Sequence, residues 1–479
     1  MRKFLLPPFS LIGKNIKGTL MSENEHASNI QSIDKTEKGS IFYAYFVSVA
    51  AAFGGLMFGI VTGAISGAIP FISEEFKLDA IMSGFTVAIV SLACVVGASL
   101  AGYFSDMLGR KKVLLISALF FVVSSILAAL AKSFPEIIIW RFISGFFVGI
   151  VSVSSPMYIS EIAPAKIRGF LVSFNQFAIV FGMLAANFVN WLFVDMGPDS
   201  WRWMFAFGAI PAVIFFISIF FIPESPRWLS VRGNTDEAFR ILSRVGGKTQ
   251  AQKEIAEIKS AIELEKSGSF TELFKPGLRM LFFIGVSLAG LSTLTGAGPV
   301  SYYAPTIFLK AGFESKSVAF FVPVIIIFVM LLCTVVVMNI MDRVGRKPLL
   351  LYGFLGLTIS MIMIGLTYHS TTIGGKMIVL PVIAFEGFYT LSVGAISWVY
   401  IAEIYPNKIR GIAMSLSAMV LWLGDFFTAQ IFPYMLEKFG QGAFYFLAVL
   451  CFLGFAFTYW KVFETKGKSL EEIERMWIK

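Results

Sequence analysis

Hydrophobic residues form long unbroken runs along this chain, without the alternation of a half-buried strand or the narrow apolar stripe of a surface helix. Each run holds about 20 mostly apolar residues, enough for one α-helix to cross the hydrocarbon core of a bilayer. Short polar segments separate the runs. The pattern predicts an all-α integral membrane protein with twelve transmembrane helices, at about residues 43–66, 84–104, 113–132, 136–157, 172–194, 201–222, 280–309, 317–338, 347–368, 377–402, 411–435 and 442–463.

Positive charge marks one side of this predicted membrane domain. Lys and Arg gather in alternate polar segments, whereas the segments between them hold acids with only scattered bases. Loops rich in Lys and Arg stay in the cytoplasm, and an even number of spans puts both ends of the chain on one side. We therefore expect a plasma-type (inner) membrane protein with both termini cytoplasmic. The basic segments are 110–112, 166–168, 227–279, 343–347, 408–410 and 461–468.

Composition narrows the function classes. With 57% hydrophobic and 14% charged residues, the chain is too apolar for a soluble protein. The net charge of +9 follows from the basic loops and gives no basic face on a soluble domain, so we expect no nucleic-acid partner. Cys94, Cys333 and Cys451 fall inside predicted helices, which argues against a disulfide framework or a zinc site. We expect the lipid bilayer as surroundings and no metal or cofactor.

Two motifs occur twice, in the same order and about half the chain length apart. Gly102–Lys112, which ends in Gly-Arg-Lys-Lys, matches Asp342–Lys347. Glu161–Gly169 matches Glu403–Gly411, both of the form Glu-Ile-x-Pro-x-Lys-Ile-Arg-Gly. Two unrelated motifs repeated at one displacement indicate a tandem of homologous halves.

The repeat predicts how the chain is divided. Each half should form a six-helix bundle, and the charged segment between them should form short helices under the membrane domain. We expect a disordered cytoplasmic tail at 1–40, bundles at 41–222 and 280–463, linker helices at 223–279 and a cytoplasmic tail at 464–479.

The repeated motifs bring acids and bases together at the expected cytoplasmic rim. Gly102 should let two helices approach closely, and Asp106 should lie near Arg110. Each Glu-Ile-x-Pro motif should place its Glu with its own Arg. Such pairs would latch one half against the other and separate when the inner gate opens. The candidate gate charges are Asp106, Arg110, Glu161, Arg168, Glu224, Arg227, Asp342, Arg346, Glu403, Arg410 and Glu464.

Across residues 41–475 these motifs resemble those of the sugar porter family in the major facilitator superfamily. Further marks of the resemblance are Arg141–Gly149, Pro156–Glu161, Pro223–Leu229 and Glu464–Gly467. The resemblance implies two pseudo-symmetric six-helix bundles with a substrate site near the midplane. It also implies a monomeric secondary transporter, not an enzyme, that moves a monosaccharide or related polyol by alternating access.

The same resemblance implies where the solute binds. Sugars present hydroxyls and weakly apolar ring faces, which amide, hydroxyl and aromatic side chains recognise. Several family positions keep such groups. The expected substrate-binding residues are Phe58, Gln176, Ser292, Thr293, Tyr302, Trp398, Trp422 and Asp425.

The seventh predicted helix departs from the family pattern. Where members usually carry two glutamines and an asparagine, this chain has Ser292, Thr293 and Gly298. Hydroxyls reach less far and make fewer hydrogen bonds than amides. The run Gly296–Pro299 should also make this helix bend readily. Ordinary hexose recognition is therefore not expected.

Proton coupling departs from the family pattern as well. Proton-coupled members usually have an aspartate in the first helix where this chain has Val61, although the fourth-helix Arg141 remains. Two other carboxylates, Glu386 and Asp425, fall inside predicted helices. An ion at such depth is costly, so these acids should be protonated, paired or hydrated. Arg141, Glu386 and Asp425 are the candidate proton-coupling residues, with protons as a second possible substrate.

Four alternatives are weighed, of which the first two stay open. The chain is either facilitative or proton-coupled, since Val61 favours the first and the two acids favour the second. The same fold could carry an organic cation, attracted by Asp425 and Glu386. A non-transporting nutrient sensor is disfavoured because such a sensor should have a long cytoplasmic extension. An enzyme is disfavoured because His26 and His369 lie far from any nucleophile constellation.

Overall fold

The computed structural model describes residues 39–164, 167–264, 270–275, 278–368, 375–406, 409–466 and 472. These residues contain helices and connecting segments, with no strand among them. Twelve helical spans are long and apolar enough to cross a membrane. The all-α, twelve-span prediction is therefore confirmed. The expected tail at 1–40 lies almost wholly outside the described residues, and so does most of 464–479.

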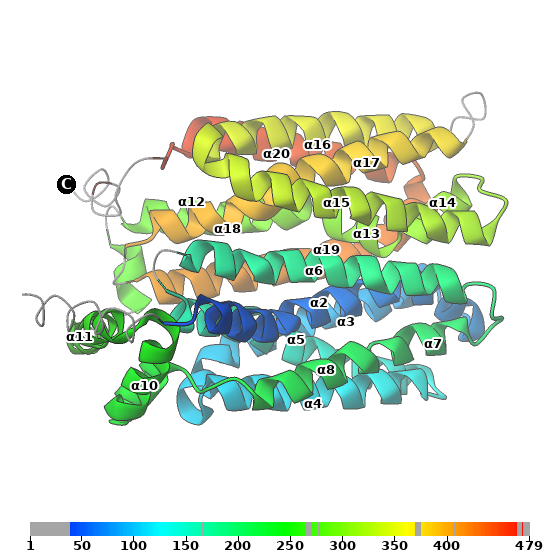
Figure 1. Ribbon diagram of the computed structural model, residues 1–479. Coiled ribbons are helices and arrows are strands. Elements are labelled where there is room, and N and C mark those ends of the chain that lie inside the picture. The colour runs from blue at the N-terminus through cyan, green and yellow to red at the C-terminus, as the bar shows by residue number, and fades with distance from the viewer. Residues whose placement is uncertain are drawn as a thin grey trace, which may run out of the picture.

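The N-terminal half runs back and forth through six spans (Figure 1). Ser40 caps the first helix and Asp79 the second, each accepting a hydrogen bond from a backbone N–H in the first turn. The elements are α2 (Ile41–Glu75), α3 (Ala80–Leu108), α4 (Arg110–Ala129), α5 (Phe134–Ile162), α6 (Arg168–Phe193) and the pair α7 (Ser200–Phe207) and α8 (Ala209–Phe220).

The segment between the halves forms the helices α9 to α11 and a 3-10 turn. Figure 1 shows α10 and α11 beyond one end of the membrane-spanning helices, and we call this the linker end. The end where α14 lies is the opposite end. The linker elements are α9 (Pro226–Val231), α10 (Thr235–Gly246), α11 (Lys248–Leu264) and η1 (Phe270–Phe274).

The C-terminal half also has six spans, but two of them are interrupted. The elements are α12 (Leu278–Leu294), α13 (Ala297–Tyr302), α14 (Ala304–Lys310), α15 (Lys316–Val344), α16 (Arg346–Tyr368), η2 (Gly375–Ile378), α17 (Val379–Phe388), the π-helical turn η3 (Tyr389–Val393), α18 (Gly394–Ile404), α19 (Arg410–Phe439) and α20 (Gly442–Lys461).

The first interruption agrees with the glycine-rich run in the sequence. The seventh span stops after Leu294 and restarts as α13, with Gly296 at a left-handed φ of 88°. The predicted bend is confirmed, but a continuous helix over 280–309 is wrong.

The π turn at Tyr389–Val393 was not predicted, because a π turn has no hydrophobic period of its own.

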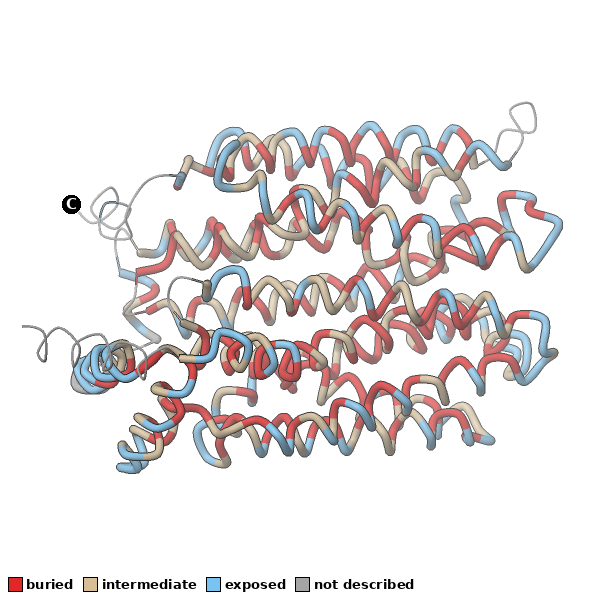
Figure 2. Tube along the Cα trace, in the orientation of Figure 1, coloured by how far each residue is buried: buried red, intermediate tan, exposed pale blue. Residues whose placement is uncertain are grey.

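Glycine stripes set the helix spacing in the N-terminal half. A Cβ at Gly55 or Gly59 in α2 would press on the backbone of α6, and one at Gly97 in α3 would press on α5. Small residues let helix backbones approach closely where lipid supplies no hydrophobic drive for association. Buried and exposed positions alternate around the membrane-spanning helices (Figure 2).

Candidate functional site

A cluster of charged side chains occupies the linker end of the N-terminal half. Arg110, the first residue of α4, contacts Asp106 at 2.9 Å and Glu161 at 3.1 Å. Glu161 also accepts a hydrogen bond from Ser225 Oγ. The side chains of Arg110 and Glu161 are 8% and 7% exposed, whereas that of Asp106 is 75% exposed. The pair with Glu161 is therefore the buried one.

Glu224 closes the N-terminus of α4. Its Oε1 accepts a hydrogen bond from the backbone N–H of Lys111 at 3.1 Å, where the helix dipole favours an anion. Gly109 alone joins α3 to α4, with a φ of 93° that residues with a Cβ rarely adopt. A Cβ there would lie 2.9 Å from the carboxyl carbon of Glu224. The motif glycine thus permits both the turn and the capping acid.

The C-terminal half repeats this arrangement. Arg346, the first residue of α16, contacts Glu403 at 2.7 Å, and Thr465 Oγ1 donates to Glu403 at 2.6 Å. Glu464 takes the place of Glu224 and accepts from the backbone N–H of Arg346 at 3.0 Å. Gly345 has a φ of 103° and leaves room for the Glu464 carboxylate. Residues after each sixth span therefore complete each cluster.

The Glu464 carboxyl lies beyond the last span. Partial burial raises its pKa, while backbone N–H groups of Lys466, Arg346, Lys347 and Thr465 lower it. The four N–H groups prevail, and the pKa of Glu464 lies below its ordinary value.

Two expectations for this rim are wrong. A Cβ at Gly102 would meet no atom within 4 Å, so no helix approaches closely there. Glu161 is bound by Arg110 and not by Arg168, whose Nε donates to the Ala163 carbonyl at 3.2 Å. The repeated spacing located the charges, but the turn at the helix start decides which Arg reaches the Glu.

The clusters also connect helices within a half rather than across halves. Arg110–Glu161 joins α4 to α5, and Arg346–Glu403 joins α16 to α18. Asp342 contacts Arg346 at 2.9 Å, again in the same half. In this conformation the expected latch between halves is therefore not made by these pairs.

At mid-depth, Asp425 of α19 connects the halves. Its Oδ2 accepts from Ser91 Oγ of α3 at 2.5 Å and from Tyr302 OH of α13 at 3.0 Å. Asp425 is 6% exposed. Its other oxygen, Oδ1, occupies the space beside Gly298 that a side chain would fill. The glycine in α13 and the acid in α19 thus fit each other.

An aromatic pair lies one turn away and also bridges the halves. The rings of Phe58 from α2 and Trp422 from α19 meet edge to face, with centroids 5.3 Å apart. Trp422 and Asp425 are three residues apart and so share one face of α19. The structure therefore groups four of the predicted substrate residues: Phe58, Tyr302, Trp422 and Asp425.

The other predicted substrate residues are not part of this group. Ser292 and Thr293 are buried, and their hydroxyls donate to carbonyls of their own helix at 2.7 Å and 3.0 Å. Gln176 is exposed on α6, and Trp398 is half-buried on α18. Thr293 adjoins Gly424 of α19, next to Asp425. The two hydroxyls keep only their acceptor lone pairs for a solute.

Arg141 is separate from both intramembrane carboxylates. It is 4% exposed and donates to the carbonyls of Thr86 at 2.7 Å and Val87 at 3.3 Å, both on α3. A cavity of about 30 Å³, large enough for water, is bordered by Arg141 and Val61. Valine therefore leaves a gap beside the guanidinium.

Glu386 of α17 is the more deeply buried acid, with 1% exposure. Its Oε1 accepts from Ser301 Oγ of α13 at 2.8 Å. Its Oε2 has no hydrogen-bond partner among the described residues. The Ser301 carbonyl in turn accepts from Ser66 Oγ of α2 at 3.0 Å. Glu386 thus connects to the other half through Ser301 of α13, whereas Asp425 contacts the other half directly through Ser91.

Contacts between the halves extend from mid-depth to the opposite end. Trp191 Nε1 donates to Ser317 Oγ at 3.1 Å, and Gln430 Nε2 donates to the Ile81 carbonyl at 2.8 Å.

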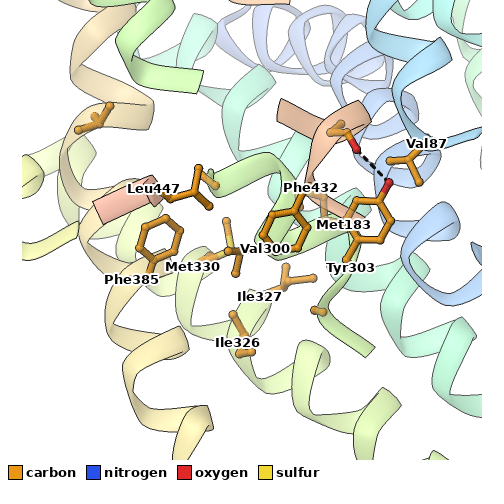
Figure 3. Close-up of a cluster of buried hydrophobic side chains, with 14 of the residues drawn as sticks. Val87, Met183, Val300, Tyr303, Ile326, Ile327, Met330, Phe385, Phe432 and Leu447 are labelled. Atoms are coloured by element: carbon orange, nitrogen blue, oxygen red, sulfur yellow. Dashed lines mark hydrogen bonds between the residues drawn. The ribbon is translucent and has the colours of Figure 1, made fainter. Parts of the chain in front are cut away.

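An apolar cluster fills the space around α13. Figure 3 shows Val87 and Met183 from the N-terminal half with Val300, Tyr303 and Phe432 from the C-terminal half. This conformation is closed at the opposite end.

Sequence reasoning did not identify Ser66, Ser91 and Ser301 as part of the site. Isolated serines in apolar helices usually bond a carbonyl of the same helix and give no distinctive pattern. The position of Ser301 beside Tyr302, in the glycine-rich seventh span, was the only available signal.

Comparison with known proteins gives a consistent result. The family model described as "Sugar (and other) transporter" matches residues 47–477. The arabinose-proton symporter of Bacillus subtilis (strain 168) is 37% identical over 455 residues, 94% of this chain and 98% of the relative. The D-xylose-proton symporter of Escherichia coli (strain K12) is 36% identical over 475 residues, 91% and 96% of the two chains.

Solved structures agree with the fold. The proton:xylose symporter XylE bound to 6-bromo-6-deoxy-D-glucose gives a TM-score of 0.77 at 34% identity, covering 91% of this chain and 99% of XylE. The inward open conformation of XylE from E. coli gives 0.79 at 32% identity, covering 91% and 100%.

Proposed function

Because this chain belongs to the sugar transporter family of the major facilitator superfamily, we propose that it carries a monosaccharide or related polyol together with a proton, by alternating access. The named relatives carry arabinose and xylose with protons. One observation supports the location of the site: Asp425 is buried at mid-depth and contacts both halves, through Ser91 and Tyr302.

The geometry suits a polyhydroxylated solute. A carboxylate accepts hydrogen bonds from two neighbouring hydroxyls, and the aromatic faces of Phe58 and Trp422 suit the C–H face of a sugar ring. Tyr302 supplies a hydroxyl that already points at Asp425. A solute entering between the halves would replace Ser91 or Tyr302 as the hydrogen-bond partner of Asp425.

The linker end is the proposed cytoplasmic side. Its loops carry the repeated Gly-Arg-Lys motifs, and Lys and Arg are retained on that side of a membrane. Both termini then lie in the cytoplasm. On this orientation, the conformation is closed on the side away from the cytoplasm.

Asp425 is the proposed coupling carboxylate. Val61 cannot hold a proton, and Arg141 is satisfied by backbone carbonyls. Asp425 instead has its charge beside the proposed sugar position, so protonation and sugar binding act on the same oxygens. Binding of one ligand at such a site changes the affinity for the other.

The test is transport into proteoliposomes that contain a pH-sensitive dye. We expect labelled arabinose or xylose to accumulate when the outside is acidic, with proton entry that follows sugar entry. Asp425→Asn should lose at least about tenfold in accumulation, the effect of one lost charge-assisted contact. Asp195→Asn, in an exposed loop, is the matched control and should match the wild type.

Glucose, galactose and an organic amine complete the solute panel. If the wild type takes up the amine and none of the sugars, the transported solute is an organic cation and not a sugar. Sugar uptake without proton movement would leave a facilitative carrier and remove Asp425 from coupling.

A further inference from the structure

Glu386 is unusual because it is buried deeply and only half satisfied. It is 1% exposed, with one oxygen bound to Ser301 and the other without a partner among the described residues. Native proteins rarely leave a buried carboxyl oxygen unpartnered without a functional reason. Glu386 also does not contact Asp425, so the proposed sugar site does not account for it.

Two more unpartnered hydroxyls follow Glu386 along the same span. Thr390 Oγ1, in the π turn, and Ser397 Oγ, in α18, are buried without hydrogen-bond partners in the described part of the chain. They succeed Glu386 in the direction of the linker end. Buried polar atoms without a protein partner are positions that ordered water commonly occupies. A π turn within a transmembrane helix is itself frequently found at functional sites.

The single partner of Glu386 lies on the segment that closes the opposite end. Ser301 belongs to α13, the short helix isolated by Gly296 on one side and by the break at Tyr303 on the other. The Ser301 carbonyl accepts a hydrogen bond from Ser66 Oγ of α2 in the other half. Motion of α13 would therefore separate Glu386 from the one hydrogen-bond partner it has in the described part of the chain and would admit water to it.

Among the described residues, the surroundings of Glu386 supply no compensating charge. The titratable groups that face Glu386 are Tyr389 of η3 on its own span, Cys333 of α15 beside Gly387 and, beyond Ser301, Tyr302 of α13. Charged residues of α15 and α16 lie toward the helix ends, and Lys376 lies in η2, before the helix begins. A dry, unpaired carboxylate is costly, so closure favours the neutral acid.

We infer that Glu386 is a proton-binding site that controls the gate formed by α13 at the opposite end. A proton bound from opposite-side water lets the segment close on the neutral carboxyl. Loss of the proton makes the closed, dry arrangement unfavourable, and α13 moves away. The inference rests on the proposed alternating access, but it assigns the gate a proton site distinct from Asp425.

The test measures the gate without any sugar. Spin labels are placed at Glu74→Cys, at the end of α2, and Glu314→Cys, after α14, both exposed positions at the opposite end. Cys333→Ala removes the more accessible native thiol, since Cys94 and Cys451 are buried. Distances between the labels are recorded in nanodiscs at about pH 5 and about pH 9. This range includes the pKa values documented for buried glutamates in other proteins.

We expect the wild-type protein to gain a longer-distance population as pH rises. Glu386→Gln, which accepts the same hydrogen bond but does not ionise, should keep the short distance at both values. Ser301→Ala keeps the acid but removes the hydroxyl that stabilises its ionised form, so the longer-distance population should be larger than in the wild type at the same pH. Glu437→Gln, an exposed acid at the same end, is the matched control and should behave as the wild type.

An unchanged pH response in Glu386→Gln would remove Glu386 from the gate. A normal response in Ser301→Ala would remove Ser301 as the connection. Because no solute is present, either outcome is independent of the transport result for Asp425→Asn.

Discussion

The two halves build the same charged cluster, but the side chains of the ion pair differ in solvent exposure. In the N-terminal half, the Arg110 and Glu161 side chains are 8% and 7% exposed, whereas Arg346 and Glu403 are 11% and 26% exposed. Each pair is completed by a hydroxyl, Ser225 or Thr465. Because removing one partner of a buried ion pair leaves an uncompensated buried charge, loss of a partner should cost more in the N-terminal copy than in the C-terminal copy.

The first spans of the two halves differ in continuity. In the N-terminal half α2 is one helix from Ile41 to Glu75, even though it contains Pro70. Its counterpart divides into α12, α13 and α14. Glycines along α2 pack it tightly on α6, whereas Gly296 breaks the seventh span. The first span is thus continuous and tightly packed in the N-terminal half and divided in the C-terminal half.

The largest expected effect tests the difference between the clusters. Arg110→Ala leaves the Glu161 carboxylate buried without its partner and should lower the free energy of unfolding by about 3–5 kcal/mol. Arg346→Ala leaves Glu403 partly hydrated and should cost about 1–3 kcal/mol. Thermal and denaturant unfolding in detergent measures both. Equal losses would mean that the two clusters are equivalent despite their different exposure.

A smaller effect tests the broken span. Gly296→Ala puts a side chain at a φ of 88°, with its Cβ 2.7 Å from Leu447 Cδ1. We expect about 1–3 kcal/mol of destabilisation and slower solute exchange. Gly102→Ala in the continuous helix α3 is the control. Its Cβ meets nothing within 4 Å, so it should be neutral or stabilising by up to about 1 kcal/mol.

If Gly296→Ala instead melts and transports like the wild type, the break in the seventh span does not depend on its glycine. Loss of transport in Gly102→Ala with unchanged stability would assign the close helix approach to another conformation.

The smallest effect concerns the cap of the C-terminal cluster. Glu464→Gln weakens the hydrogen bonds to the first turn of α16 and should cost about 1 kcal/mol at neutral pH. Since the folded-state pKa of Glu464 is lowered, its stabilisation is present above the unfolded value of about 4.3 and is lost as pH falls through the folded value. Melting temperatures of wild type and variant should therefore converge in acid. A constant difference down to about pH 3 would contradict this.

Several features followed from residue patterns alone. The twelve spans follow from apolar runs, and the break near Gly296 follows from two glycines and a proline in a short stretch. The association of Asp106 with Arg110 follows from helical spacing. The division of the chain into tails, bundles and linker, and the roles of the site residues, remain predictions.

Other features depend on how distant segments meet. Glu161 has Arg168 close in sequence but binds Arg110, because Gly109 starts α4 directly beneath α5. Glu224 was grouped with the gate charges, yet its position at the start of α4 appears only in the fold. No local pattern distinguishes Ser91 and Ser301 from other serines in apolar helices.

The sequence by itself determined the membrane-spanning architecture, the repeat and the kinds of charge at the rim. These depend on local length, hydropathy and spacing, which act within a few turns of one helix. Only the tertiary structure decided which acid meets which base, that Ser91 of α3 binds Asp425 across the halves, and that Ser301 of α13 links Glu386 to Ser66 of the other half. Those contacts join residues far apart in the chain, and their geometry depends on how whole helices pack.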